Sequence, residues 1–171
     1  MYFIYICQEV HTQSKMTTPA QTYETALHKA AAYCSSAERC ISELKEKLSK
    51  WEVDELDQFK VIDYLIQENY IDEKRFATAY AKDKFRYNKW GKIKIKYQLN
   101  LKQINRDVIE QALTAIDEDE YKTMLVNLAK DKVKKITFSN EYEKKGKLIR
   151  FLSGKGFENE AIYQVLEKLD V

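Results

Sequence analysis

The residues best suited to chemistry in this 171-residue chain lie between positions 75 and 102. This stretch alternates cations with aromatic rings: Arg75, Lys84, Phe85, Arg86, Tyr87, Lys89, Trp90, Lys92, Lys94, Lys96 and Tyr97. Cations bind phosphates and aromatic rings stack on bases, so the combination favours single-stranded nucleic acid. Arginine, tyrosine and tryptophan are also favoured anchors of protein interfaces. For Trp90, simple packing between helices is an equally good interpretation.

Motifs for catalysis and metal binding are missing from the sequence. It has no G-x-x-x-x-G-K-[ST] loop, no G-x-G-x-x-G, no H-E-x-x-H and no nucleophile elbow. The acidic run at 117–120 stands at an expected helix start, where capping is a better interpretation than metal binding. No zinc-ligand spacing involves Cys7, Cys34, Cys40 or His28, and we expect Cys34 and Cys40 to pack as small hydrophobes. We therefore expect no catalytic residue, no metal and no cofactor.

Charge is segregated along the chain, although the formal net charge is only +2. Residues 36–73 contain eleven acidic and five basic residues, whereas residues 82–106 contain nine basic residues and one acidic residue. Residues 122–155 contain ten basic and three acidic residues. This distribution favours a polyanion or an acidic protein surface as partner, with ordinary solvated helix faces as the alternative.

The first residues do not predict a membrane or export signal. The apolar run "MYFIYICQEV" is too short to span a bilayer and lacks the cationic start and cleavage site of a signal peptide. Residues 1–19 are expected to be a tail, or an over-extended start, since Met16 precedes another plausible beginning. The odd number of cysteines suits reduced thiols, so we expect a cytoplasmic protein with no membrane contact.

Helix formers dominate, and one proline with four glycines leaves few tight turns, so the composition predicts an all-α fold. Ser35 and Glu38 have the spacing of a capping box, and Asp72 and Asn105 precede further amphipathic stretches. We expect helices to begin at these residues. A turn at Gly154 and Gly156 is expected between the last two helices.

Apolar spacing predicts which helix faces are buried. In residues 54–69 the expected inward stripe is Leu56, Phe59, Ile62 and Ile66, widened by Val61 and Leu65. In residues 72–88 the residues expected to share a face are Phe76, Ala79, Tyr80 and Tyr87.

The expected helices follow a pattern that repeats along the chain. The anchors Leu48, Leu99 and Leu152 lie 51 and 53 residues apart, each before a turn and a further apolar stripe. We infer three tandem three-helix units, at residues 20–71, 72–117 and 118–171, whose neighbours stack to make the core.

The repeat also decides the conformation of "KIKIK", residues 92–96. Its period of two is typical of a strand, but its place in the repeat is that of a helix. As a helix it points Ile95 and Leu99 inward and leaves Ile93 and Tyr97 as a flanking pair.

The stretch from residue 69 to residue 99 resembles the central signature of the RecX family, bacterial regulators of the recombinase RecA. The matching residues are Tyr70, Ile71, Asp72, Arg75, Phe76, Ala77, Gly91, Ile95 and Leu99. Further similarity lies in Ala26, Leu27, Glu43, Leu44 and Leu48 near the start, and in Lys155, Gly156 and Phe157 near the end. Two positions differ from the family: Asn69 and Gln103 stand where glycine is usual. Asparagine tolerates a left-handed conformation, whereas glutamine would cost about 1 kcal/mol there, so a different cap is the alternative at Gln103.

The resemblance implies an elongated, curved array that lies in the groove of the RecA–single-stranded DNA filament. There it would lower the ATPase, strand-exchange and coprotease activities of RecA without being an enzyme, and we expect a monomer. The residues expected to face the filament are Arg75, Lys84, Arg86, Lys89, Trp90, Lys92, Lys96, Lys147 and Arg150. Two alternatives remain: a nucleic-acid-binding module that acts without RecA, and a purely structural helical scaffold.

Overall fold

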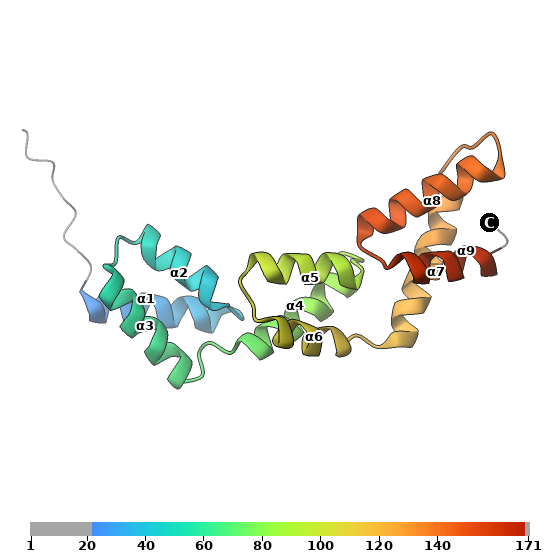
Figure 1. The fold of residues 1–171 in the computed structure, drawn as a ribbon. Helices are drawn as coiled ribbons and strands as arrows, with labels where there is room; N and C mark the ends of the chain where they lie inside the picture. The colour runs from blue at the N-terminus through green and yellow to red at the C-terminus, as the bar shows by residue number, and fades with distance from the viewer. Residues whose placement is uncertain (1–21, 170–171) are drawn as a thin grey trace, which may run out of the picture.

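The computed structural model describes residues 22–169, and in that part of the chain all regular structure is α-helical (Figure 1). The helices are α1 (Tyr23–Ser36), α2 (Ile41–Lys50), α3 (Glu55–Gln67), α4 (Glu73–Arg86), α5 (Lys92–Leu101), α6 (Arg106–Thr114), α7 (Glu118–Val133), α8 (Glu141–Lys155) and α9 (Asn159–Lys168). The all-α prediction is confirmed. The tail predicted for residues 1–19, including Cys7, lies outside the described residues.

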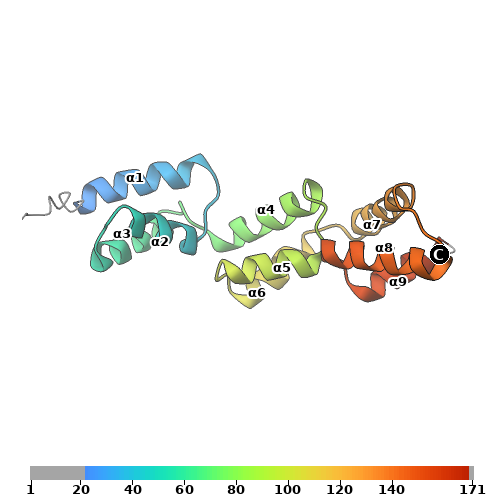
Figure 2. The same cartoon turned by 90° about the horizontal axis from the view of Figure 1, so that it is seen from above.

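The helices form three successive groups along an elongated molecule (Figures 1 and 2). We call α1–α3 unit 1, α4–α6 unit 2 and α7–α9 unit 3. Helices pack mainly against the other two members of their own group. The second helices of the units, α2, α5 and α8, follow one another along the long axis. The array of three-helix repeats expected from the leucine spacing is therefore present.

The buried side chains fall into two clusters instead of one continuous core. Units 2 and 3 share a cluster that includes Ile95, Leu125 and Phe157, whereas unit 1 has its own cluster around Leu44 and Leu65. The expectation that every neighbour stacks into a single core is thus wrong at the boundary between units 1 and 2. Cys40 alone among the unit 1 residues is part of the larger cluster.

The "KIKIK" segment is helical, as the repeat predicted, and forms the start of α5. Ile95 and Leu99 are fully buried, while Ile93 and Tyr97 are 53% and 59% exposed. The period of two misleads because only one side of this helix contacts the core. Burial of the i, i+4 pair decides the conformation.

Short-range capping was predicted correctly in three of four places, one of them the acidic run, where Asp117 accepts hydrogen bonds from the backbone N–H groups of Asp119 and Glu120. Asp72 accepts hydrogen bonds from the backbone N–H groups of the first turn of α4, and Asn105 does the same for α6. The capping box at Ser35 is wrong, because Ser35 lies in the last turn of α1 and α2 begins only after Cys40. Glu38 is used instead in an ion pair with Arg75 of unit 2, at 2.5 Å.

The buried face of α3 differs from the predicted one. Val61 and Leu65 are fully buried, whereas Leu56, Phe59 and Ile66 are 64%, 70% and 40% exposed. The apolar residues of this helix cover more than half of its circumference, so spacing alone did not determine which side meets α1 and α2. The same correction applies in α4, where Phe76 is buried but Tyr87, beyond its last turn, is 81% exposed.

The second helix of every unit ends in the same turn. Glu52, Gln103 and Gly156 have left-handed φ values of 58°, 61° and 88°. In each case the next residue donates its N–H to the carbonyl of the anchor leucine, Leu48, Leu99 or Leu152, at 3.2–3.3 Å. This is the Schellman arrangement, which prefers glycine at the left-handed position. Gly154 lies inside α8, so the predicted turn is at Gly156 alone.

Gln103 therefore adopts the left-handed conformation despite the cost for a residue with a Cβ. We expect Gln103→Gly to raise the free energy of unfolding by about 0.5–1 kcal/mol, because relief of that cost exceeds the added entropy of glycine in the unfolded chain. Urea unfolding at neutral pH measures the change. A lower stability would show that contacts of the glutamine side chain outweigh the backbone strain.

Candidate functional site

Three lysines and two aromatic rings form an alternating row on α4 and at both ends of α5. The Lys102 ammonium lies 5.7 Å from the ring centre of Tyr80, and the Lys84 ammonium lies 5.1 Å from the same ring. Lys84 is also 5.6 Å from the ring of Trp90, whose other neighbour is Lys94 at 4.9 Å. We call this row, Lys102–Tyr80–Lys84–Trp90–Lys94, the cation–aromatic ladder.

The ladder combines the two groups that bind single strands, namely cations for phosphates and rings for bases. Lys94 extends it towards unit 3, because its ammonium donates to the backbone carbonyl of Gly154 at 3.4 Å. Trp90 is half-buried and packs against the core shared by units 2 and 3, so its packing role is real. Sequence reasoning placed Lys94 in the cation–aromatic stretch but not among the residues expected to face the filament, and it did not select Tyr80 or Lys102. The i, i+4 spacing of Tyr80 and Lys84 was an available signal, but no local pattern links Lys102 to them.

Four of the other cations expected at the site are paired with carboxylates from outside their own helix. Arg75 joins Glu38 across the boundary of units 1 and 2, and Arg86 of α4 lies 3.5 Å from Glu120 of α7. The corresponding pairs in α5 are Lys92 with Glu118 and Lys96 with Glu110. These contacts offset the repulsion expected between lysines one helical turn apart.

Lys147 and Arg150 belong to α8 of unit 3 and are not members of the ladder. Lys147 pairs with Glu143 at 2.7 Å and also donates to the carbonyl of Thr137. The hydrogen bonds from Lys147 and Ser139 lower the pKa of Glu143 to about 2. Arg150 is exposed on α8. Lys89 is also exposed, in the left-handed turn (φ 56°) before α5.

Units 2 and 3 join through their backbones. The N–H of Gly91 donates to the carbonyl of Lys155 at 2.9 Å, and the N–H of Ile93 donates to the carbonyl of Gly156 at 3.0 Å. Free N–H groups at the start of α5 thus meet carbonyls at the end of α8. A Cβ on Gly91 would lie 2.2 Å from the Gly156 oxygen, so the contact requires glycine.

The boundary between units 1 and 2 is made by side chains instead. Ser42 Oγ donates to the carbonyl of Lys102 at 2.7 Å, and Lys102 Nζ lies 2.5 Å from Glu43 Oε1. Lys102 of the ladder therefore also holds unit 1 in place.

Neither a membrane-spanning helix nor a cluster of metal ligands is found in the part of the chain that the structure describes. Within residues 22–169 no helix is long and apolar enough to cross a membrane. The same part of the chain has no cluster of three or more His, Cys, Asp or Glu side chains that could hold a metal ion. Cys34 and Cys40 are buried, as expected of small hydrophobes, and His28 is exposed.

Comparison with known proteins places these units in a family. Residues 72–113 match the family model for the second three-helix domain of RecX, and residues 118–166 match the model for its third three-helix domain. A "Regulatory protein RecX" of Clostridioides difficile is 34% identical over 149 residues, which cover 87% of this chain and 70% of that protein. The chain belongs to the RecX family.

Other RecX relatives are matched over a smaller share of their length. The "Regulatory protein RecX" of Clostridium botulinum strain Alaska E43 is 35% identical over 128 residues, or 74% of this chain and 59% of that protein. The chain thus spans about three-fifths of the length of several curated RecX relatives it matches.

The RecX fold is supported by solved structures. The crystal structure of RecX from Lactobacillus salivarius superposes with a TM-score of 0.79 at 24% identity, covering 86% of this chain and 96% of that one. A second crystal structure, of regulatory protein RecX, has a TM-score of 0.75 at 21% identity, covering 85% and 73% of the two chains.

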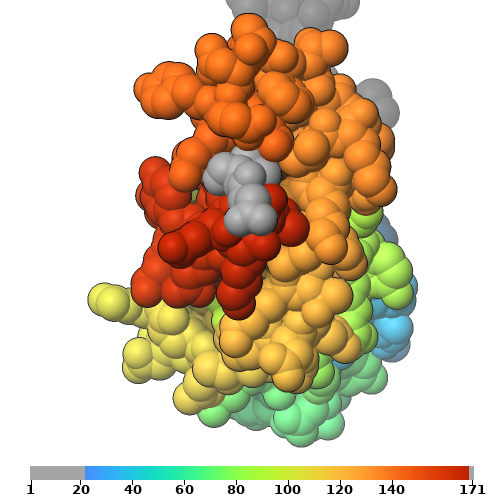
Figure 3. Space-filling view, turned by 90° about the vertical axis from the view of Figure 1, so that its right-hand side faces the viewer, coloured from blue at the N-terminus to red at the C-terminus, as the bar shows by residue number. Residues whose placement is uncertain are grey.

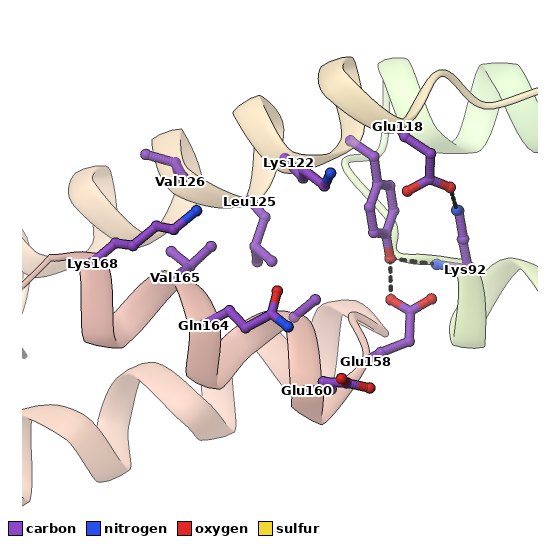
Figure 4. A pocket seen from close by; sticks show the side chains of 12 residues that line it. Lys92, Glu118, Lys122, Leu125, Val126, Glu158, Glu160, Gln164, Val165 and Lys168 are labelled. Atoms are coloured by element: carbon purple, nitrogen blue, oxygen red, sulfur yellow. Dashed lines mark hydrogen bonds and ion pairs between the residues drawn. The ribbon is translucent and has the colours of Figure 1, made fainter.

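In this RecX-family chain, the hydroxyl of Tyr121 joins units 2 and 3 through Glu158 and Lys92, which are labelled in Figure 4. It donates to Glu158 Oε2 at 2.5 Å and accepts from the backbone N–H of Lys92 at 3.1 Å. The Tyr121 side chain is 4% exposed and lines a cavity of about 360 Å³ that Glu118 borders. Burial, then the hydrogen bond to Glu158, raises the pKa of Tyr121 well above its ordinary value.

Tyr121→Phe is expected to lower the free energy of unfolding by about 1–3 kcal/mol at pH 7, because Glu158 and the Lys92 N–H lose their partner. A raised pKa in the folded state contributes stability below the unfolded pKa of about 10 and loses it as pH rises further. The difference between the two proteins should therefore shrink above pH 10. Denaturant unfolding at several pH values tests this, and a difference that does not depend on pH would contradict it.

Proposed function

We propose that this protein regulates RecA by binding the RecA–single-stranded DNA filament in the cytoplasm. Binding lowers the ATPase, strand-exchange and coprotease activities of RecA, and the protein performs no catalysis itself. Membership of a family named for regulatory proteins supports the regulatory role. The observation that carries the DNA-facing part of the proposal is the cation–aromatic ladder.

Two of the ladder lysines, Lys84 and Lys94, differ from the ion-paired cations, Lys102 among them, in how readily they meet a phosphate. The ammonium groups of Lys84 and Lys94 lie over rings, so a phosphate can approach without displacing a carboxylate. Lys92 and Lys96 must first release Glu118 and Glu110. We therefore rank Lys84 and Lys94, with exposed Lys89 and Arg150, as the main filament contacts. The ion-paired Arg75, Arg86, Lys92, Lys96 and Lys147 are secondary contacts.

The direct test is the single-stranded-DNA-dependent ATPase of RecA from the same source, with this protein present below equimolar amount. A progressive loss of ATP hydrolysis that excess naked DNA does not relieve supports binding to the filament. Charge reversal of three or more of the proposed contact residues should abolish that loss. Unchanged inhibition by such a variant would refute the proposed surface.

The ladder also favours a second candidate, a nucleic-acid-binding module that acts without RecA. Such a module would bind naked single strands tightly, with a slope of roughly 0.7 log units of affinity per log unit of salt for each phosphate neutralised. A filament regulator should bind naked strands weakly and filaments much better. Fluorescence anisotropy on both ligands at several salt concentrations separates the two.

A further inference from the structure

Each unit has a groove between its second and third helices, and the three grooves differ in chemistry. The unit 2 groove, between α5 and α6, is lined by Lys92 and Lys96. Both lysines are ion-paired there, with Glu118 and Glu110, so this groove satisfies its own charges. The other two grooves belong to units 1 and 3, the two end units of the elongated molecule (Figure 1), and Figure 3 views the molecule from the unit 3 end.

The unit 1 groove is apolar with acids at its edge. Phe59, Ile62 and Ile66 line it, together with the carboxylates of Glu55 and Asp63 and the ammonium of Lys45. Phe59 and the neighbouring Leu56 are 70% and 64% exposed. An exposed apolar surface of this kind marks a protein interface. The excess of acids here and throughout residues 36–73 repels nucleic acid.

The unit 3 groove is aromatic with cations at its edge. Tyr142 of α8 and Tyr163 of α9 line it and are 89% and 52% exposed. Ile149 also lines it, and Lys145 and Arg150 supply positive charge. Glu143 also lines it but is neutralised by Lys147. Its volume of about 790 Å³ is larger than the 540 Å³ of the unit 1 groove.

We propose that these two faces bind each other in successive copies of this protein, so that the molecules associate head to tail. The protruding Phe59 and Leu56 of one copy enter the aromatic groove of the next, while Glu55 and Asp63 face its Lys145 and Arg150. Opposite charge around apolar centres fixes the orientation of such a contact. Two different faces make it heterologous, so it does not close on itself as a symmetric dimer would.

From the sequence we expect a monomer, whereas this proposal predicts self-association. The proposal does not depend on the proposed function. If both hold, copies follow one another along a filament. Arg150 belongs to both surfaces and is therefore left unchanged in the test.

Three double variants of the full chain test the proposal by sedimentation velocity over a wide range of protein concentration. Leu56→Asp with Phe59→Asp removes the unit 1 face. Tyr142→Asp with Tyr163→Asp removes the unit 3 face by opposing acids to acids. The matched control is Ile93→Asp with Tyr97→Asp, which adds the same charge at similarly exposed positions of α5, outside both grooves. Circular dichroism checks that all three remain helical.

The wild-type protein and the control should sediment faster as concentration rises. Each face variant alone should stay monomeric, with association weakened by more than about tenfold. The unit 1 variant loses the apolar side chains that enter the groove and would have to bury carboxylates in their place, and the unit 3 variant opposes acids to acids. An equimolar mixture of the two face variants should form a one-to-one dimer and nothing larger, since each retains one intact face.

Four results would overturn the proposal. They are a wild-type protein that is monomeric at every concentration, a mixture that does not dimerise, a face variant that self-associates alone, and a control that loses association equally. A monomeric wild-type protein whose binding to the RecA filament is lost in the unit 1 variant would assign that face to the recombinase instead.

Discussion

Replacing Gly91 with alanine is expected to lower the free energy of unfolding by about 3 kcal/mol. The new Cβ would lie 2.2 Å from the oxygen of Gly156 and 2.4 Å from the nitrogen of Phe157, and both are backbone atoms that cannot rotate aside. Overpacking costs about 1–3 kcal/mol, and separation of the helices would weaken two hydrogen bonds worth about 1 kcal/mol each. The φ of Gly91 is −78°, which alanine adopts freely, so the whole effect is steric contact between units.

Urea unfolding followed by far-UV circular dichroism measures this effect, and Gly146→Ala is the matched control. Gly146 lies inside α8 with no atom within 4 Å of a Cβ placed on it. Alanine there should raise the free energy of unfolding by about 0.5–1 kcal/mol through helix propensity. Equal stability of Gly91→Ala and the wild-type protein would mean that the junction opens at little cost.

Reversing the charge of Lys84 and Lys94 together should raise the concentration needed to half-inhibit the RecA ATPase by about tenfold or more. In the variant Lys84→Glu with Lys94→Glu, each new carboxylate repels the phosphates that the lysine attracted. The structural effect should be small, because these ammonium groups contact rings and, at Lys94, one backbone carbonyl at 3.4 Å, but no carboxylate. The same reversal at Lys92 would also break its contact with Glu118. Weaker inhibition by that variant could then result from lower stability as well as from weaker binding.

The control reverses Lys29 and Lys47, two lysines of unit 1 whose ammonium groups likewise lie over rings, 6.0 Å from that of Trp51 and 5.6 Å from that of Tyr33. These lysines lie outside the ladder, so inhibition should be nearly unchanged. Loss of inhibition by both double variants would indicate a response to net charge alone. Full inhibition by the Lys84 and Lys94 variant would remove the ladder from the filament contact, whether or not the protein regulates RecA.

The sequence by itself determined the features that depend on residues close together in the chain. The caps at Asp72 and Asn105 form over two or three residues, and the leucine anchors 51 and 53 residues apart showed the repeat. The repeat in turn made "KIKIK" a helix, against its local period. Asn69 was correctly allowed a left-handed conformation, with φ 58°.

Only the tertiary structure decided which cations are free of carboxylate partners and which residues join the units. The partners of Lys92, Lys96 and Lys102 lie 14 to 59 residues away in sequence, in other helices. Which part of the broad apolar surface of α3 is buried depends on its contacts with α1 and α2. The division of the buried side chains into two clusters likewise depends on how the units pack. Local spacing fixes the direction of a side chain relative to its own helix. Whether it meets core, carboxylate or solvent depends on contacts between helices distant in sequence.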